Sequence, residues 1–202
     1  MEHSVQTFHN HPGIDQVVIV TAPEFMEKVQ GMVKANNWTK VTAVLAGGKE
    51  RYDSSLAAVR HFADKPDTVM LFHDAARPLV SERIITDTLK AMEKYDAVDV
   101  AIPAVDTIVQ CNSEGTFMES IQDRSLLWRM QTPQGFRQKT IEKAYSIALK
   151  DPKFTATDDC GTVLRYLPDV KVGIVRGSER NIKLTYADDL SLLQFLLSEP
   201  ER

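Results

Sequence analysis

A carboxylate and a guanidinium stand close together directly after one apolar run of the sequence. Residues 73–78 read His-Asp-Ala-Ala-Arg-Pro, which puts Asp74 three residues before Arg77. A carboxylate suits a hydrated metal ion, and a guanidinium suits a phosphate. A structural ion pair that closes a loop is the alternative, because Asp–Arg pairs of that kind are common.

A second segment has the features of an anion-binding turn. Gly47, Gly48 and Lys49 lie between an apolar run and a helix that is expected from Ser54, and free backbone N–H groups at a helix start attract negative charge. The segment is not a Walker A loop, because Glu50 stands where Ser or Thr would hold magnesium. The alternative is a plain tight turn.

Lys183 is the third candidate. It is flanked by Ile182 and Leu184, so that one face of this segment presents a cation. A lysine there could neutralise charge on a phosphoryl group during transfer, a task of positioning and electrostatics. A solvated surface lysine is the commoner alternative. Ser-His-Asp hydrolysis is a poor competitor, because no serine of the sequence occupies a nucleophile-elbow context.

The elements that must hold these residues alternate between strands and helices. Short apolar runs typical of strands buried on both faces occur at residues 16–20, 41–45, 68–72 and 98–102. Helical spacing of apolar residues follows the first three runs, from Pro23, from Ser54 and after Ser81 as N-cap. This order predicts an α/β fold with a mostly parallel sheet in three αβα layers, in which ligands collect beyond the carboxyl ends of the strands.

The second half of the chain begins with a different pattern. Residues 107–110 and 117–121 flank Asn-Ser-Glu-Gly at residues 112–115, which predicts an antiparallel hairpin. We expect residues 105–131 to protrude as an arm from a single domain of residues 1–202. Beyond the arm, the apolar spacing predicts helices and one strand, at residues 139–149, 158–167 and 187–197 for the helices and 170–175 for the strand.

Composition excludes several classes of protein. A net charge of -4 and dispersed basic residues argue against a nucleic-acid surface. No apolar run approaches the roughly 20 residues that cross a bilayer, so no membrane partner is expected and the cytoplasm is the default location. Cys111 and Cys160 are isolated in the sequence, which gives no support to a disulfide scaffold or a zinc site.

Taken together, seven short motifs are much more specific than any one of them. In order and spacing they resemble the 2-C-methyl-D-erythritol 4-phosphate cytidylyltransferase family, and the resemblance runs from the first residues to about Leu197. The motifs are Gly47-Gly48-x-Glu50-Arg51-x-Asp53-Ser54, His73-Asp74-Ala75-Ala76-Arg77-Pro78, Asp106-Thr107, Asp123-Arg124-x-x-x-Trp128, Gln131-Thr132-Pro133-Gln134-Gly135-Phe136, Thr157-Asp158-Asp159 and Asn181-Ile182-Lys183-x-Thr185.

The resemblance implies a Rossmann-like nucleotidyltransferase fold and a reaction of CTP. A sugar-alcohol phosphate would attack the α-phosphorus, pyrophosphate would leave, and Mg²⁺, supported by Asp74, would bridge the triphosphate. Carried over motif by motif, the catalytic residues would be Lys183, Asp74 and Arg77. The nucleotide would contact Gly47, Gly48, Lys49, Arg51, Ser54 and Ala75, and the acceptor would contact Asp106, Thr107, Arg124, Thr132, Thr157 and Thr185.

The resemblance also implies a homodimer. In this family the arm matching residues 105–131 reaches across to a second subunit, and the arginine that matches Arg124 enters the partner's site. An exposed hairpin edge is a hazard for an isolated chain, and pairing with a twin removes it.

The sequence departs from the family at its front. Family members begin with a strand, a glycine-rich loop and a Pro-Lys pair ahead of the segment that matches residues 1–5, and the sequence starts after them. Because that loop would hold the triphosphate through backbone N–H groups, we expect weak or no turnover. Two alternatives follow: a ribitol or ribulose 5-phosphate cytidylyltransferase of the same superfamily, and a non-catalytic remnant that dimerises or binds a nucleotide.

Overall fold

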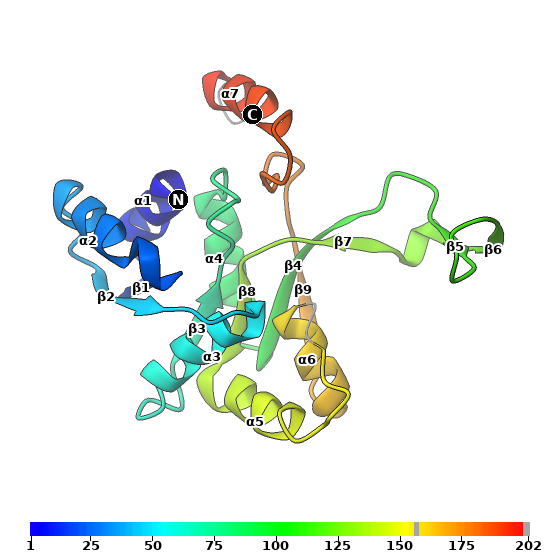
Figure 1. The fold of residues 1–202 in the computed structure, drawn as a ribbon, viewed down its shortest axis with the longest axis horizontal. Helices are drawn as coiled ribbons and strands as arrows, with labels where there is room; N and C mark the ends of the chain where they lie inside the picture. The colour runs from blue at the N-terminus through cyan, green and yellow to red at the C-terminus, as the bar shows by residue number, and fades with distance from the viewer. Residues whose placement is uncertain (156–157, 200–202) are drawn as a thin grey trace.

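A computed structural model describes residues 1–155 and 158–199 of the chain. Figure 1 shows a central group of strands with helices on both sides and an arm that projects from the body. The α-helices are α1 (Glu2–Asn10), α2 (Met26–Ala35), α3 (Arg51–His61), α4 (Glu82–Ala91), α5 (Gln138–Ala148), α6 (Asp159–Tyr166) and α7 (Asp189–Ser198). The strands are β1 (Val17–Thr21), β2 (Val41–Ala46), β3 (Val69–Phe72), β4 (Ala97–Pro103), β5 (Val109–Cys111), β6 (Met118–Ile121), β7 (Trp128–Met130), β8 (Gln134–Arg137) and β9 (Val172–Arg176).

The α/β class is confirmed, but the expected mostly parallel sheet fits only roughly. β1 pairs with β2 in parallel, and β4 pairs with β9 in parallel. The larger sheet has the order β3-β8-β4-β7, with β9 also on β4, and β8 runs antiparallel to both β3 and β4. The sheet is mixed because the chain runs back through β7 and β8, which lie antiparallel to their neighbours. The apolar pattern did not predict β8, because this strand begins with Gln134 and Gly135.

Local sequence explains where two helices begin. Ser81 caps α4 as expected, since its Oγ accepts a hydrogen bond from the Ile84 N–H at 3.4 Å. The helix expected from Ser54 begins three residues earlier, at Arg51, because Glu50 and Asp53 form a capping box around its first turn. The helix α1 was not predicted from the sequence.

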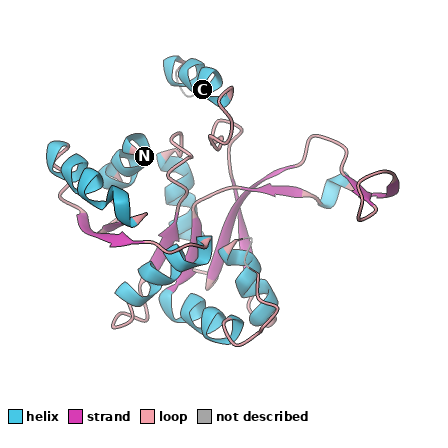
Figure 2. Ribbon diagram, in the orientation of Figure 1, coloured by secondary structure: helices cyan, strands magenta, loops and turns pink. Residues whose placement is uncertain are grey.

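Side chains from both faces of the larger sheet form separate cores. Ala97 and Val98 are neighbours in β4 and enter different clusters, as the alternation of a strand requires. One cluster joins the sheet to α3, α5 and α6 through residues such as Phe136, and the other joins it to α1 and α4 through residues such as Ile85. These contacts give the three layers that Figure 2 shows as helices on either side of the magenta strands.

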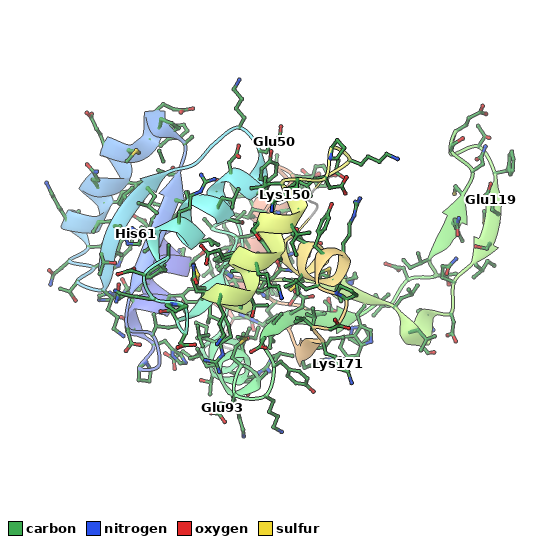
Figure 3. The ribbon with its side chains drawn as sticks, turned by 90° about the horizontal axis from the view of Figure 1, so that it is seen from below. Glu50, His61, Glu93, Glu119, Lys150 and Lys171 are labelled. Atoms are coloured by element: carbon green, nitrogen blue, oxygen red, sulfur yellow. The ribbon has the colours of Figure 1, made fainter. Side chains whose placement is uncertain are left out.

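The arm carries β5 and β6, which pair with each other in antiparallel fashion. All residues of both strands are exposed. Figure 3 shows Glu119 of β6 standing with the hairpin well away from the rest of the molecule. Within residues 1–155 and 158–199, no helix is long and apolar enough to cross a membrane.

Candidate active site

Three charged side chains meet beyond the end of β3. The Asp74 carboxylate lies 3.0 Å from Lys183 Nζ and 3.7 Å from Arg77 Nε, all measured to Oδ2. Asp74 follows β3, and Lys183 lies in the segment after β9, so the fold brings together residues that are far apart in the sequence. The sequence predicted these three residues as the catalytic group, and the structure clusters them at the rim of the sheet.

Electrostatics keep the Asp74 carboxylate ionised. Burial alone raises the pKa of Asp74, but the hydrogen bond and charge of Lys183, with the charges of Arg51 and Arg77, hold it below its usual value. Burial lowers the pKa of the Arg77 guanidinium, an effect that the charges of Asp74 and Asp99 oppose. A guanidinium stays protonated in proteins, so the rim carries two cations around one anion.

Arg77 is held by main-chain oxygen atoms. Its Nη1 donates to the carbonyl of Asn181 at 2.8 Å, and its Nη2 donates to the carbonyl of Met130 at 3.4 Å. These bonds attach the loop after β3 to the loop after β9 and to the end of β7. Arg77 therefore positions neighbouring segments in addition to placing a positive charge beside Asp74.

The imidazole of His73 fixes the backbone of Asp74 through Thr132. The Arg77 carbonyl can only accept, so His73 Nε2 donates to it at 3.0 Å and Nδ1 is the unprotonated nitrogen. Thr132 Oγ1 then donates to Nδ1 at 2.9 Å and accepts from the Asp74 N–H at 3.1 Å. Burial lowers the pKa of His73 to about 4, which keeps the ring neutral. The predicted contact of Thr132 with the acceptor stays a prediction, and in this structure its hydroxyl bonds to His73 and Asp74.

Asn181 is a site residue to which sequence reasoning gave no role. It is fully buried, and its Nδ2 donates to the carbonyl of Thr132 at 2.8 Å and to Gln131 Oε1 at 3.3 Å. Asn181 lies two residues before Lys183, so these bonds connect the segment of Lys183 to the segment of Thr132. The only signal in the sequence was its place in the motif with Lys183.

The glycine turn packs closely against the start of α3. A Cβ on Gly47 would lie 2.6 Å from Ser54 Oγ, and one on Gly48 would lie 2.4 Å from the Asp53 carboxylate. A Cβ on Gly48 would also lie 2.4 Å from Asp53 Cβ, which leaves no room for another residue, whereas a Cβ on Gly47 would require the Ser54 hydroxyl to turn away. Ser54 is partly buried beneath the turn, whereas Lys49 is exposed.

Arg51 forms an ion pair with a buried carboxylate. Its Nη1 lies 2.7 Å from Asp159 Oδ2, and the hydroxyl of Tyr145 donates to Asp159 Oδ1 at 2.5 Å. Burial lowers the pKa of Arg51, but the charge and hydrogen bond of Asp159 outweigh it and raise the pKa overall. The charge of Arg51 also lowers the pKa of Asp74. The glycine turn and the rim of the sheet are therefore close enough to interact electrostatically.

The remaining predicted residues do not join this cluster within the described chain. Asp106 and Thr107 are exposed at the base of the arm, and Arg124 donates to the Val105 carbonyl at 2.8 Å on the same arm. The backbone N–H of Thr185 donates to Asp189 Oδ2 at 2.7 Å, which starts α7. Ala75 is exposed in the loop beside Asp74. Thr157 lies outside the described residues.

A second buried acid lies under the site. Burial raises the pKa of Asp99 to about 7, although the hydrogen bond that Gln134 Nε2 donates at 2.9 Å favours the charged form. Asp99 sits in β4 and was not singled out from the sequence. Among the residues that the structure describes, no group of three or more His, Cys, Asp or Glu side chains that could hold a metal ion occurs.

Comparisons with known proteins agree on one family. The family model of 2-C-methyl-D-erythritol 4-phosphate cytidylyltransferase matches residues 1–199. A relative of that name from Thermobifida fusca (strain YX) is 43% identical over 201 residues, which cover 98% of this chain and 81% of the relative.

Two other proteins extend the comparison. The bifunctional ribulose 5-phosphate reductase/CDP-ribitol pyrophosphorylase Bcs1 of Haemophilus influenzae is 42% identical over 191 residues, and the match spans only 40% of that protein. The crystal structure of 4-diphosphocytidyl-2C-methyl-D-erythritol synthase from Anaerococcus prevotii DSM 20548 superposes with a TM-score of 0.87 at 24% identity, over 98% of this chain and 85% of that one, which supports the fold. The chain therefore belongs to the 2-C-methyl-D-erythritol 4-phosphate cytidylyltransferase family.

Proposed function

We propose that the chain transfers a cytidylyl group from CTP to 2-C-methyl-D-erythritol 4-phosphate. The observation that carries the proposal is the cluster at the rim of the sheet, where Asp74 Oδ2 lies 3.0 Å from Lys183 and 3.7 Å from Arg77, in a chain that matches the family over residues 1–199. The residues 1–202 form one nucleotidyltransferase domain in this proposal, with 105–131 as its arm. Because CTP is an intracellular nucleotide, the cytoplasm is the proposed location.

Catalysis of this transfer depends mainly on positive charge that stabilises the transition state, and the protein forms no covalent bond to the substrate. An oxygen of the acceptor phosphate forms a bond to the α-phosphorus of CTP, and the bond from that phosphorus to the bridging oxygen breaks and releases pyrophosphate. Negative charge grows on the phosphoryl oxygens as this happens. Lys183 and Arg77 supply cations already fixed in place, and such preorganised charge lowers the barrier without reorganisation.

Asp74 is the residue that would hold a magnesium ion. Its carboxylate is kept ionised, and Mg²⁺ in nucleotide sites takes one or two carboxylates together with substrate phosphates and waters. When bound, the ion would neutralise charge on the triphosphate. Lys183 lies 3.0 Å from Asp74 Oδ2, so the lysine and the ion would share this carboxylate.

The turn of residues 47–54 is the proposed nucleotide-binding segment. Gly47 and Gly48 bring the backbone close to the start of α3, and the N-terminal end of a helix favours the negative charge of a nucleotide. Ser54, Lys49 and Arg51 supply polar atoms near this end. The alternative of a plain tight turn predicts no loss of CTP affinity when Lys49 is changed.

The arm suits a homodimer in which each subunit completes the site of the other. Large apolar side chains stand exposed along it, including Phe117, Met118, Ile121 and Leu126, and exposed apolar surface of this extent marks an interaction site. Asp106, Thr107 and Arg124 lie on the arm, away from Asp74 of the same chain. In the proposed dimer they contact the acceptor bound in the partner subunit.

A second candidate substrate is ribitol 5-phosphate or a related pentitol phosphate. It is favoured by the 42% identity to part of a protein named as a CDP-ribitol pyrophosphorylase. The two activities share the chemistry at the α-phosphorus and differ in the alcohol. Competing-substrate assays decide between them, and preference for the pentitol phosphate would overturn the first choice.

Side-by-side measurement of CTP binding and pyrophosphate release tests the proposal. Calorimetry reports binding, and a coupled phosphate assay reports release with each alcohol phosphate present. Release that depends on the acceptor supports the transferase. Binding without release supports a nucleotide-binding protein that transfers nothing.

A further inference from the structure

Asp159 is a fully buried carboxylate that bonds to side chains of two other helices. Its Oδ2 lies 2.7 Å from Arg51 Nη1, and its Oδ1 accepts from the Tyr145 hydroxyl at 2.5 Å. Asp159 begins α6, whereas Arg51 begins α3 and Tyr145 lies in α5. Because no part of Asp159 is exposed to solvent, these bonds replace the water that an ionised carboxylate otherwise binds.

The Tyr145 hydroxyl fixes the orientation of this carboxylate. Tyr145 is almost completely buried, and burial together with the charge of Asp159 raises its pKa, so the hydroxyl keeps its proton and donates it to Oδ1. The backbone N–H of Asp159 donates to Gln134 Oε1 at 3.2 Å. With its main chain and Oδ1 both held, Asp159 presents Oδ2 in one direction, toward Arg51.

The bond to Asp159 leaves part of the Arg51 guanidinium available for another partner. Nη1 is bonded to the carboxylate, whereas Nε and Nη2 have no hydrogen-bond acceptor within residues 1–155 and 158–199. The side chain is 38% exposed, so these two nitrogen atoms can reach a molecule in solution. A guanidinium with unused donors suits the oxygen atoms of a phosphate.

The fold alone gives little reason for a cation at this position. Arg51 is the first residue of α3, and the start of a helix favours negative charge over positive charge. Enclosing the Asp159 carboxylate costs further free energy, and apolar side chains of similar volume often stabilise a protein at least as well as a buried ion pair. The charge of Arg51 also acts on Asp74 at the rim. The pair therefore suits the site better than it suits the fold.

We propose that Asp159, held by Tyr145, is a positioning residue that directs the Arg51 guanidinium toward a phosphate group of the bound nucleotide. An arginine side chain has many rotamers, so fixing one of its nitrogen atoms in advance reduces the entropy lost on binding. Asp159 is enclosed and acts only through Arg51. The inference rests on the proposed function, because it takes residues 47–54 as the nucleotide-binding segment.

An apolar replacement beneath Arg51 separates positioning from folding. The variant Asp159→Leu with Tyr145→Phe keeps the volume and removes both members of the buried hydrogen bond, so neither is left without a partner. Arg51 is partly exposed and can be hydrated when the carboxylate is gone. Asp159→Asn is the matched control, because it keeps the shape and an acceptor oxygen for Arg51.

Calorimetry with CTP and Mg²⁺ on the full chain measures the effect on binding. The apolar variant should bind CTP about tenfold more weakly, which corresponds to loss of one well-placed hydrogen bond to a charged group. Its urea midpoint should not fall, and Asp159→Asn should lose less affinity. In a chain that carries Arg51→Met, the apolar replacement should cause no further loss, because the effect of Asp159 passes through Arg51.

The mobility of the guanidinium gives a second measurement that needs no nucleotide. The order parameter of the Arg51 Nε–H bond is obtained from ¹⁵N relaxation of the natural chain and of the apolar variant. We expect it to fall below about 0.6, the range of flexible groups, only in the variant.

Several outcomes would overturn the proposal. Loss of folding in the apolar variant would show that the pair serves the fold, and an unchanged CTP affinity or order parameter would show that Asp159 does not orient Arg51. An equal loss of affinity with and without Arg51→Met would show that Asp159 acts by another route, even if the chain releases pyrophosphate normally. The expected pattern of CTP affinities without any pyrophosphate release would contradict the transferase and still support this role of Asp159.

Discussion

The rim of the sheet and the arm place their polar residues in opposite ways. At the rim, Asp74, Arg77 and Thr132 are held by bonds between segments 53 to 104 residues apart in the sequence. On the arm, the Arg124 side chain donates to a carbonyl 19 residues away, and the strands β5 and β6 are exposed throughout. The comparison indicates that contacts between distant segments of one chain fix the charges at the rim, whereas the arm presents its charged side chains at the surface, where the proposed dimer would bring a second subunit.

Removing the positive charge of Lys183 is expected to have the largest effect on the reaction rate. Lys183→Ala should lower the rate of pyrophosphate release by about 10²- to 10³-fold, as loss of a preorganised charge does elsewhere. Lys183→Arg keeps the charge and serves as the matched control. Because Lys183 is half exposed, the free energy of unfolding should hardly change. An unaltered rate in Lys183→Ala would remove Lys183 from the site.

Thr132→Val tests whether the rim is held together internally. The variant keeps the shape but removes the hydroxyl that joins His73 Nδ1 to the Asp74 N–H. Two buried partners then lack a bond, and the free energy of unfolding in urea should fall by about 1–3 kcal/mol. Thr132→Ser retains the hydroxyl and should lose much less. Equal stability of the two variants would contradict the network.

His73 and Asp99 should change the stability of the fold in opposite directions as the pH falls. His73 has its pKa lowered to about 4, so its contribution to stability falls as pH drops from about 6.5 to 4. Asp99 has its pKa raised to about 7, so its contribution grows as pH drops through the same range. The two slopes oppose each other in the natural chain.

Asp99→Asn removes one of these slopes and keeps the Oδ1 acceptor for Gln134. Between pH 4 and 6.5, the plot of unfolding free energy against pH should become steeper by about 1.4 kcal/mol per pH unit, with lower stability in acid. Urea titrations at a series of pH values measure this. Parallel curves for the variant and the natural chain would show that Asp99 does not bind a proton in this range.

Introducing a charge on the arm should have the smallest effect on the stability of the single chain. Met118→Glu changes an exposed side chain, so the free energy of unfolding should stay within about 0.5 kcal/mol. If the arm joins two subunits, sedimentation should nevertheless show a shift from dimer to monomer. Glu119→Gln, on the adjacent residue of β6, is the control for a change of charge alone. A dimer that survives Met118→Glu would locate the interface elsewhere.

The sequence predicted the parts of the fold that depend on local pattern. The apolar runs of β1 to β4 and the cap of α4 were found because their signals lie within a few residues. β8 was missed because Gln134 and Gly135 look polar and flexible, although Gln134 is buried by its bonds to Asp99 and to the N–H of Asp159. Such burial depends on partners from distant segments.

The same limit applies to the site. Asp74, Arg77 and Lys183 follow strands, so the topology of an α/β sheet predicted that they would meet at one edge. His73 and Asn181 received no role, because an imidazole or amide acts according to the groups around it. Thr132 was assigned to the acceptor by resemblance, and its contacts with His73 and Asp74 were visible only in the structure.

A double-mutant cycle on Asp74 and Lys183 tests the central claim most directly. The rates of pyrophosphate release are compared for Asp74→Asn, Lys183→Met, the double variant and the natural chain. Because the two side chains are 3.0 Å apart, we predict a coupling of at least about 1 kcal/mol, so that the double variant loses less than the product of the single losses. Single losses that simply multiply would show that the two residues act independently and would contradict a shared site at the rim of the sheet.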